Sequence, residues 1–426
     1  MRRVLSLILG GGKGTRLYPL TQTRAKPCVP FAGKFKLIDI PISNCFHAGF
    51  KQIYILTQFN SAPLHSHITN TYRFAPFDQD FVEILAAEQT YDHEGWYRGT
   101  ADAVRNSLDR FRVHSPTQYL ILSGDQLYRM DLRDLLKNHV QKRAEISIAV
   151  IPVRREQASD LGIVKIDESG RVVAFLEKPE PSADIQEMAI AEGFPLAEQL
   201  RNEGKEYLSS MGIYIFNASA LEKALNNSYS DFGKEVIPTC LEKIKVYAYI
   251  FQGYWEDIGS ILSFYAANLN LTTIFPAFNF YDEKKPIYTS QSHLPSSKVN
   301  SCSIHQSLTS DGSIITNATI RNSIIGNRNI IEDGAYLDGV ICMGNEYYET
   351  INQKEENQKK GIPNLGIGRG TMIRKAIIDQ NVRIGDYCRI GIDDIPRQNG
   401  HFVGYSIVDG IMVIAQDATI PSRTVI

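Results

Sequence analysis

Residues 4–17 read VLSLILGGGKGTRL, and this stretch decides how the first part of the chain folds. Val4–Leu9 is a continuous apolar run, which is typical of a short strand buried on both faces. Glycine fills four of the next five positions. Because glycine lets backbone N–H groups approach an anion closely, the stretch predicts a strand that ends in a cradle for phosphate groups.

The glycine loop matches neither of two common nucleotide-binding motifs. It is not a Walker A loop, because no Gly-Lys-[Ser/Thr] closes it, and it lacks the three-glycine spacing of dinucleotide-binding folds. Arg16 and Lys26 follow it, and two cations beside a phosphate cradle fit a triphosphate. The residues alone leave two alternatives open: a nucleotide site, or a plain tight turn with two surface charges.

Similar apolar runs alternate with helical patterns along residues 1–265. In chain order these are the runs Gln52–Thr57 and Gln118–Ser123, the helical patterns 100–111 and 132–143, and the runs 145–150 and 211–216. The alternation predicts an α/β fold with a Rossmann-like, mixed but mostly parallel sheet, covered by helices on both faces. In such folds ligands bind beyond the carboxyl ends of the strands, which here means residues 10–16 and Gly124-Asp125.

The last part of the chain has a different pattern. Isoleucine occurs 25 times in residues 1–300 and 24 times in residues 301–426, so the last part is more than twice as rich in it. Aliphatic residues recur there every six positions: Ile314, Ile320; Ile325, Ile331, Leu337; Ile367, Ile373; Ile378, Ile384, Ile390; Ile414, Ile420, Ile426. This period predicts a parallel β-helix of hexapeptide repeats rather than an isoleucine-rich sandwich. The charged stretch 346–360 lacks the period and is predicted to be a projecting loop.

Composition and charge narrow the class of protein. The 45 Lys and Arg residues nearly balance 47 Asp and Glu residues, and the net charge of −2 argues against a nucleic-acid partner. No apolar run approaches the roughly 20 residues of a membrane-spanning helix, so we expect no membrane partner. The six scattered cysteines have no metal-ligand spacing, and we interpret them as reduced thiols of a cytoplasmic protein. We expect domains at residues 1–265 and 301–426, joined by a proline-marked connector at 266–300.

Two aspartates are candidates for holding Mg²⁺. Asp125 follows the run Gln118–Ser123, and an aspartate at the carboxyl end of a sheet strand is well placed beside bound phosphates. Asp257, in the stretch 255–259, is the second candidate. Mg²⁺ keeps several waters and takes few protein ligands, so two carboxylates suffice.

The residues together resemble the sugar-nucleotide pyrophosphorylases and, within them, the glucose-1-phosphate adenylyltransferases. The resemblance covers essentially the whole chain. It rests on residues 10–16, 24–27, 33–35, 38–41, 96–105, 128–131, 175–179, 210–214, 231–234, 254–259 and 361–364. It implies a nucleotidyltransferase domain followed by a left-handed β-helix. It also implies Mg²⁺-dependent formation of ADP-glucose and diphosphate from ATP and glucose 1-phosphate, the first committed step of glycogen or starch synthesis.

The resemblance also implies roles for individual residues. The residues implied to bind ATP are Gly10, Gly11, Gly12, Gly14, Thr15, Gln89, Gly99 and Thr100. Those implied to bind glucose 1-phosphate are Tyr97, Gly162, Glu177, Lys178 and Ser210. The implied catalytic residues are Arg16, Lys26 and Asp125, and the implied metal ligands are Asp125 and Asp257. The family also implies a homotetramer regulated by small-molecule effectors.

This chain departs from the family's pattern at four positions. Gln126 stands where the family usually has histidine, and Thr23, Gln380 and Gln416 stand where relatives carry lysines that bind phosphorylated activators. A neutral amide cannot replace an ammonium group against a phosphate. We therefore expect weak activation, or activation through other basic residues such as Arg24, Lys34, Arg374 and Lys375.

Two other functions remain as alternatives. The first is a sister nucleotidyltransferase that uses UTP, dTTP or GTP, which residues 96–105 and the hexad layout disfavour. The second is a regulatory subunit that has lost catalysis. The presence of Arg16, Lys26, Asp125 and Lys178 disfavours that second alternative.

Overall fold

The computed structural model describes residues 3–75, 77–87, 95–392 and 398–426. The chain divides into two compact units, and each is described by itself. Unit 1 consists of Met1–Gly12 and Ile40–Trp255, and unit 2 of Lys13–Asp39 and Glu256–Ile426. These units are defined by packing, and the domain boundaries that we expect at residues 265 and 300 stay a prediction.

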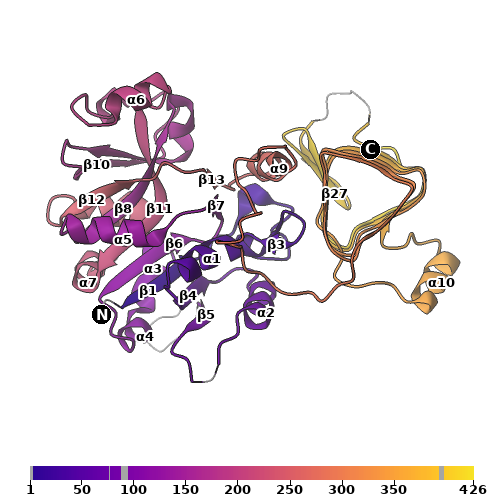
Figure 1. The fold of residues 1–426 in the computed structure, drawn as a ribbon, viewed down its shortest axis with the longest axis horizontal. Helices are drawn as coiled ribbons and strands as arrows, with labels where there is room; N and C mark the ends of the chain where they lie inside the picture. The colour runs from indigo at the N-terminus through magenta and orange to yellow at the C-terminus, as the bar shows by residue number, and fades with distance from the viewer. Residues whose placement is uncertain (1–2, 76, 88–94, 393–397) are drawn as a thin grey trace. The chain divides into compact units, whose positions relative to one another are not determined.

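Unit 1 is built on a nine-stranded mixed sheet (Figure 1). Seven strands lie side by side in the order β10 (Val172–Glu177), β9 (Gly162–Ile166), β11 (Tyr207–Asn217), β6 (Gln118–Ser123), β1 (Val4–Leu9), β4 (Gln52–Thr57) and β5 (Phe81–Ala86). Two more strands extend the sheet: β8 (Ile146–Val153) pairs with β11, and β12 (Val246–Ile250) pairs with β8. The strands from β6 to β5 are parallel, whereas β11 pairs antiparallel with each of its neighbours. The α/β prediction is confirmed.

The apolar runs became strands because they are buried on both faces. Five of the six residues of β1 are buried, and the bounds of β1, β4 and β6 coincide with the predicted runs. Helices α2, α5 and α7 pack on strands of this sheet. The helices of this part of the chain are α1 (Asp39–His47), α2 (Ala62–Thr71), α3 (Thr100–Asn106), α4 (Leu108–Arg112), α5 (Leu132–Gln141), α6 (Ala197–Asn202), α7 (Ala218–Leu225) and α8 (Ile237–Cys240).

The single helix predicted at residues 100–111 is wrong in one respect, because the structure breaks it into α3 and α4 at Ser107. The Ser107 hydroxyl donates to the carbonyl oxygen of Ala103 at 3.0 Å, and such a bond to the preceding turn is known to bend helices. The helix predicted at 132–143 is confirmed as α5. It begins after Asp131, whose side chain accepts from the backbone N–H of Arg133.

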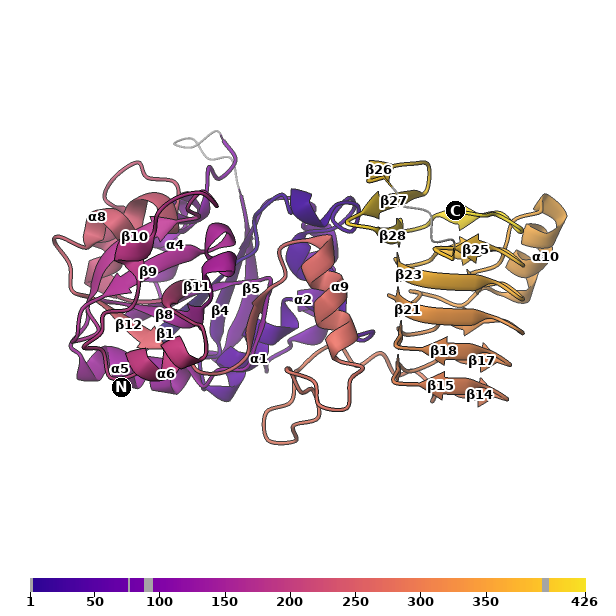
Figure 2. The ribbon, with the colours of Figure 1, turned by 90° about the horizontal axis from the view of Figure 1, so that it is seen from above.

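Unit 2 contains a parallel β-helix whose coils form a triangle when seen along their axis (Figure 1) and a stack when seen from the side (Figure 2). One of its sheets consists of β14 (Lys298–Asn300), β17 (Ile314–Thr316), β20 (Ile330–Ile331), β22 (Gly366–Ile367), β24 (Arg383–Ile384) and β29 (Thr419–Ile420). The other comprises β15 (Ser303–His305), β16 (Leu308–Thr309), β18 (Thr319–Arg321), β19 (Ile324–Ile325), β21 (Tyr336–Cys342), β23 (Met372–Ile378), β25 (Arg389–Ile390), β26 (Gly400–His401), β27 (Tyr405–Val408) and β28 (Ile411–Ile414).

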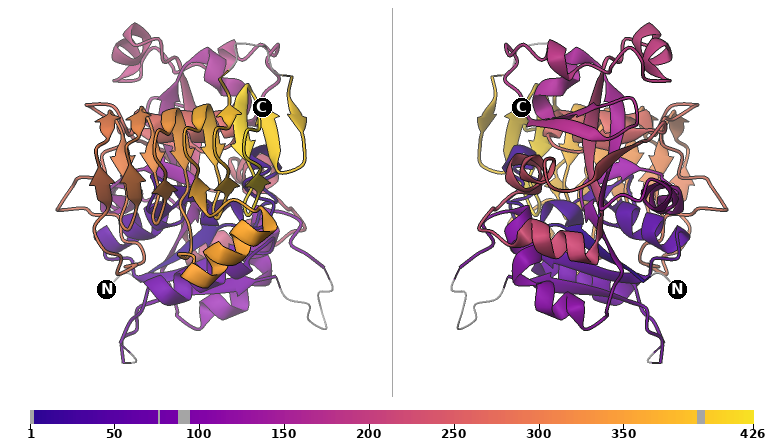
Figure 3. Two further views of the ribbon diagram at one scale, coloured as in Figure 1. Left: turned by 90° about the vertical axis from the view of Figure 1, so that its right-hand side faces the viewer. Right: turned by 90° about the vertical axis from the view of Figure 1, so that its left-hand side faces the viewer.

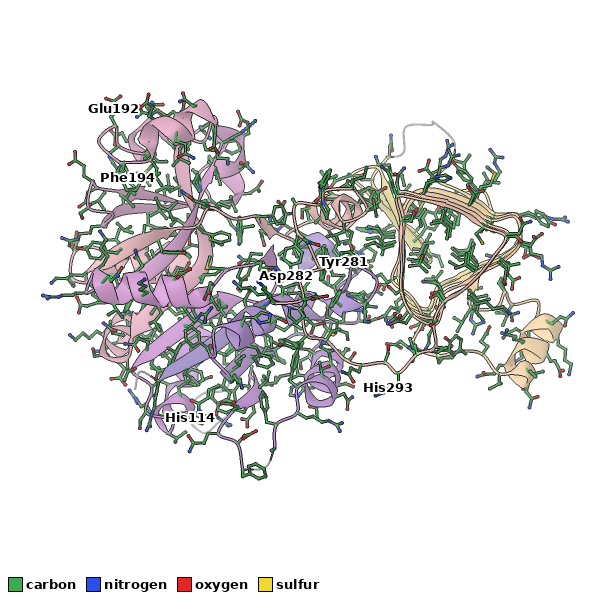
Figure 4. All side chains as sticks on the ribbon, in the orientation of Figure 1. His114, Glu192, Phe194, Tyr281, Asp282 and His293 are labelled. Carbon is green, nitrogen blue, oxygen red and sulfur yellow. The ribbon has the colours of Figure 1, made fainter. Side chains whose placement is uncertain are left out.

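Aliphatic side chains fill the triangle, as Figure 4 shows. The predicted interior positions are at most 4% exposed, except Ile314 and the partly buried Ile426. Ile314 is a wrong prediction. It is 39% exposed, and its neighbour Ile315 is fully buried instead, opposite Ile331 of the next coil. From Ile315 to Leu337, the buried interior positions follow one another in steps of 5, 5, 6 and 6 residues. A strict step of six back from Ile320 therefore selects Ile314 instead of its buried neighbour.

The stretch 346–360, predicted to be a loop, contains a helix, α10 (Ile351–Lys360), which projects from the coils (Figure 3). Thr350 and Gln353 cap its beginning reciprocally, and Gly361 ends it with a φ of 65°. A second departure from the coils is the antiparallel hairpin β26–β27–β28, which the sequence pattern did not predict. None of the helices formed by the described residues is long and apolar enough to span a bilayer.

The segment 13–39 belongs to unit 2 because it packs on the residues that follow the sheet. It contains the short elements η1 (Thr15–Leu17), η2 (Lys26–Cys28), β2 (Pro30–Phe31) and β3 (Phe35–Lys36). Phe31 makes an edge-to-face contact with Phe264 of α9 (Ile261–Asn270), with ring centroids 6.0 Å apart. The backbone N–H of Ala32 donates to Asn268 Oδ1 at 2.9 Å. Residues Arg16 and Lys26 are therefore carried by unit 2.

Candidate active site

The glycine loop begins where three parallel strands end. The Gly10 N–H donates to the carbonyl of Leu56, the penultimate residue of β4, at 2.8 Å, and the Gly124 N–H, just after β6, donates to that of Leu9 at 3.0 Å. Among the described residues, no atom outside residues 11–13 lies within 4 Å of the place where a Cβ of Gly12 would stand. The backbone is thus open on one side of Gly12, which suits a phosphate cradle.

Gly14 makes the sharp turn that follows. Its φ is +63°, in the left-handed region, and a Cβ there would lie 3.0 Å from Thr21 Cγ2 and 3.3 Å from Lys26 Cβ. The Thr21 hydroxyl donates to the Gly14 carbonyl at 2.9 Å. A side chain here would be strained by the positive φ and would press on Thr21 and Lys26, so glycine lets the stem of Lys26 pack directly against the loop.

Asp125 lies just beyond the end of β6 and is partly exposed. The Ser123 hydroxyl donates to Asp125 Oδ1 at 2.5 Å, which fixes the direction of the carboxylate. The next residue, Gln126, is buried, and its Oε1 accepts a hydrogen bond from the Trp255 indole N–H at 3.2 Å. The Gln126 amide therefore binds the Trp255 side chain, a contact that the sequence did not predict.

Glu177 lies at the end of β10, between two glycines. A Cβ at Gly162, its partner in β9, would stand 2.7 Å from Glu177 Oε2, and a Cβ at Gly233 would stand at the same distance. Burial raises the pKa of Glu177; Lys178 opposes this shift, whereas Asp231 adds to it. Glycines on both sides therefore leave room for the carboxylate of Glu177 itself, which is costly to bury unless hydrogen-bond donors reach it.

Ser210 is linked to the same group of residues through Tyr214. The Ser210 and Tyr214 hydroxyl oxygens lie 3.4 Å apart, and the Gly212 N–H donates to Ser210 Oγ at 3.2 Å. Burial raises the pKa of Tyr214, the Ser210 hydrogen bond lowers it, and the charges of Glu177 and Asp231 raise it further. The structure thus brings Gly162, Glu177, Lys178 and Ser210 together, and their predicted role toward glucose 1-phosphate stays a prediction.

Gly99 and Thr100 meet the segment 230–234. A Cβ at Gly99 would lie 2.4 Å from the Ser230 carbonyl oxygen, so this close approach requires glycine. The Thr100 hydroxyl donates to Asp231 Oδ2 at 3.3 Å and accepts from the Phe232 N–H at 3.1 Å. Their predicted role toward ATP stays a prediction.

Sequence reasoning gave no role to Asp231, Gly233 or Lys234, although they lie beside Glu177 and Thr100. Asp231 caps the helical turn at 232–236 by accepting from the N–H groups of Gly233 and Lys234. An aspartate followed by Phe-Gly-Lys is a helix-start signal that could have drawn attention to this segment.

Tyr97 is hydrogen-bonded to other segments of unit 1. The Tyr97 hydroxyl donates to the Ala86 carbonyl at 3.3 Å, and Gln58 Nε2 donates to the Tyr97 carbonyl at 3.2 Å, so Tyr97 is held at the ends of β4 and β5. Its predicted sugar-phosphate role stays a prediction. Gln89 lies outside the described residues.

Arg16, Lys26 and Asp257 come together in unit 2. Lys26 Nζ lies 3.8 Å from Asp257 Oδ1. The site that a Gly259 Cβ would occupy is 3.0 Å from Asp257 Oδ2 and 3.4 Å from Arg16 Nη2. Asp257 therefore has Lys26 near one carboxylate oxygen, while its other oxygen and Arg16 border the place of the missing Gly259 Cβ. Thr15, at the start of η1, is exposed beside Arg16.

The predicted Mg²⁺ ligands are chemically suitable. Within residues 3–75, 77–87, 95–392 and 398–426, no group of three or more His, Cys, Asp or Glu side chains could hold a metal. Mg²⁺ does not need such a group, since one or two carboxylates with phosphates and waters satisfy it. Asp125 and Asp257 are hard oxygen donors of that kind, and their sharing of one ion stays a prediction.

The family comparisons agree with the two parts of the fold. A model of the nucleotidyl transferase family matches residues 5–274, and a model of the GLGC left-handed parallel beta-helix domain matches residues 292–425. The left-handed β-helix prediction is therefore confirmed. This succession is the domain architecture of glucose-1-phosphate adenylyltransferase, and it implies a nucleotide and a sugar phosphate as substrates.

Proposed function

The chain belongs to the nucleotidyl transferase family, and from this premise we propose that it transfers the adenylyl group of ATP to α-glucose 1-phosphate, giving ADP-glucose and pyrophosphate. The observation that carries the proposal is the GLGC-type β-helix that follows the transferase domain. The reaction would be the committed step of glycogen or starch synthesis.

The chemistry needs positioning more than covalent catalysis. A phosphate oxygen of glucose 1-phosphate attacks the α-phosphorus of ATP, the bond from that phosphorus to the bridging oxygen breaks, and pyrophosphate leaves. The protein must hold two anions that repel each other and neutralise the charge that moves onto the leaving group. Arg16 and Lys26 supply that positive charge, and the open backbone at Gly12 supplies N–H donors for the phosphates.

The carboxylates have separate duties in this proposal. Asp125 and Asp257 would hold Mg²⁺, which supplies charge neutralisation on the phosphates. The Glu177 carboxylate, which fits against Gly162 and Gly233, accepts hydrogen bonds from sugar hydroxyls, and Lys178 faces the phosphate of the sugar. A half-buried ionised carboxylate is stabilised by such donors, and it rejects a sugar that does not supply them.

The contacts around Thr23 and Gln416, two of the four departing positions, favour a weak response to phosphorylated effectors. Gln416 Oε1 accepts hydrogen bonds from Thr23 Oγ1 at 2.6 Å and from the Arg24 guanidinium. Arg24 is buried in an ion pair with Asp379, and Lys34 is paired with Asp311 at 3.0 Å. We propose that neither cation serves an effector. An assay with and without 3-phosphoglycerate tests this, and strong activation lost on mutating Arg24 or Lys34 contradicts it.

One experiment separates the candidate activities. The full chain is supplied with glucose 1-phosphate, Mg²⁺ and each of ATP, UTP, dTTP and GTP in turn, and pyrophosphate release is measured. We expect release with ATP at least tenfold faster than with any other nucleotide. Faster turnover with UTP, dTTP or GTP would indicate the sister activity, and no release with any nucleotide would indicate a regulatory subunit.

A further inference from the structure

The segment that carries Arg16 and Lys26 is fastened to the β-helix by a buried ion pair. Arg24 Nη1 lies 2.9 Å from Asp379 Oδ1, and the two side chains are only 4% and 2% exposed. The other guanidinium nitrogen donates to Gln416 Oε1, and the Met343 sulfur lies 4.0 Å from Nη1. Asp379 and Gln416 lie on successive coils, because β23 pairs with β28 just before them. Arg24 therefore bridges two coils.

Burying such a pair is costly, so its value is geometric. Removing two charges from water can cost more than their attraction returns, and buried pairs are weak evidence for stability. A guanidinium with two planar donor edges does fix direction, because Asp379 and Gln416 accept from different nitrogens. The pair determines where residue 24 lies on the β-helix.

The backbone transmits that position to Lys26 over two residues. Ala25 is buried, and η2 begins immediately after it, with the Cys28 N–H bonded to the Ala25 carbonyl at 2.9 Å. The Lys26 stem then packs against the Gly14 turn, and its ammonium group faces Asp257. A buried residue and a hydrogen-bonded turn therefore connect Arg24 to Lys26.

We propose that Arg24 and Asp379 are positioning residues for the transfer reaction: they hold Lys26 against the Gly14 turn, where the triphosphate meets it. The β-helix is then part of the catalytic scaffold. This inference rests on the proposed function, since it assumes that Lys26 contacts the triphosphate. It assigns to Arg24 no contact with any ligand.

Three variants test the pair in the full chain, with pyrophosphate release as the assay. Arg24→Lys keeps the charge but cannot reach both Asp379 and Gln416, and Asp379→Asn removes one charge. We expect each to lower kcat by about 10- to 100-fold, the scale of a misplacement near 1 Å, with the KM for glucose 1-phosphate within about twofold of the wild-type value. The double variant Arg24→Met/Asp379→Leu keeps the site buried and apolar, so it should fold stably yet show the same loss.

A matched control is present in the same unit. Glu349 is a fully buried carboxylate paired with Arg383 at 2.5 Å, and it also accepts from the Leu365 N–H. We expect Glu349→Gln to lower the thermal midpoint about as much as Asp379→Asn while leaving kcat near the wild-type value. Equal loss of kcat in both variants, or full turnover in Arg24→Met/Asp379→Leu, would overturn the proposal.

Two further measurements separate positioning from direct action. If Arg24 acts through Lys26, then Arg24→Lys should cost nothing further in a Lys26→Ala background, whereas losses that multiply would refute it. Hydrogen exchange of the amides in residues 13–28 should accelerate in Arg24→Lys but not in Glu349→Gln. Hydrogen exchange needs no turnover, so it tests whether the Arg24–Asp379 pair holds residues 13–28 even if the wild-type protein releases no pyrophosphate. Absence of pyrophosphate release would refute the proposed function alone. Unchanged exchange in Arg24→Lys would refute the positioning role of the pair.

Discussion

Parallel strand pairs occur both in the mixed sheet of unit 1 and in the β-helix of unit 2, but the strands end in different ways. In the sheet, β1 ends in a glycine loop and β6 in Ser123-Gly124-Asp125, two unlike segments side by side. In the β-helix, corners recur with a similar left-handed residue, such as Asn317, Asn322 and Asn381, whose φ values lie between 44° and 59°. Unlike strand ends can gather different chemical groups at one edge, whereas repeated ends produce a regular stack.

The same difference predicts where a substitution will be felt. At the sheet edge a single side chain has a role that no neighbour duplicates, so its loss should change catalysis and leave the fold intact. In the β-helix each interior side chain packs on its equivalents in neighbouring coils, so its loss should change stability and leave catalysis intact.

The largest expected effect is that of Asp125→Ala at the end of β6. Turnover should fall by about 10²–10³-fold or more, because a well-placed electrostatic group is lost, while the thermal midpoint stays close to that of the wild type. Pyrophosphate release and thermal unfolding measure the two quantities. Asp333→Ala is the matched control, since Asp333 is an exposed β-helix carboxylate that accepts from Asn317 at 2.7 Å. Near-wild-type turnover in Asp125→Ala would remove the distinction between the two kinds of strand end.

The next effect is on stability. Ile373→Ala deletes a fully buried side chain that stacks between Leu337 and Ile390. The free energy of unfolding should fall by about 2–5 kcal/mol, because the cavity cannot collapse between stacked coils. Denaturant unfolding measures the loss, and turnover per folded molecule should stay unchanged. Ile351→Ala, at a position that is 76% exposed, should cost almost nothing. If turnover per folded molecule falls together with stability in Ile373→Ala, the interior of the β-helix affects catalysis as well as stability, contrary to the comparison above.

A smaller effect is expected from Glu177→Gln, which should weaken activity while it stabilises the fold. Because burial raises its pKa, the ionised form is disfavoured in the folded protein, and folding bears that cost at any pH above the folded pKa. Glu177→Gln should therefore raise the thermal midpoint at pH 8, raise the KM for glucose 1-phosphate, and lose its stabilising effect as the pH falls through the pKa of the wild-type carboxyl.

Glu203 provides the control for that sign. A hydrogen bond from Lys205 lowers the pKa of this exposed carboxyl, so Glu203→Gln should not raise the midpoint at pH 8. Thermal scans of both variants between pH 4 and 8 measure the difference. A midpoint that falls in Glu177→Gln would mean that this carboxylate stabilises the fold, contrary to the functional interpretation of its burial.

The sequence predicted those features that depend on neighbouring residues or on a repeat, and it failed where residues distant in the chain decide the structure. The bounds of β1, β4 and β6 were predictable because a strand buried on both faces needs only its own apolar residues. The β-helix period was predictable because it repeats. Ile314 was wrong because the choice between adjacent isoleucines is made by the next coil, which a count along the chain does not include.

The site was predictable in its parts and not in its arrangement. Glycines after β1 and the aspartate after β6 are local signals, whereas Glu177 meets Gly162 and Gly233 only through the fold. Arg24 and Asp379 are 355 residues apart, and nothing in either neighbourhood indicates the other. The resemblance to a known family supplied residue roles, but it said nothing of this pair.

The smallest effect is expected at α10, the helix that the sequence pattern missed because none of its residues is buried. With no apolar face to signal it, the helix depends on its caps, and Thr350 and Gln353 form the first of them. Thr350→Ala should cost about 1 kcal/mol locally, seen as faster hydrogen exchange of amides 351–360. Global unfolding and turnover should match those of Thr419→Ala, a change on an exposed β-helix strand. A global loss of stability would show instead that α10 supports the coils. The stability of the β-helix would then depend on a projecting helix as well as on its repeated coils.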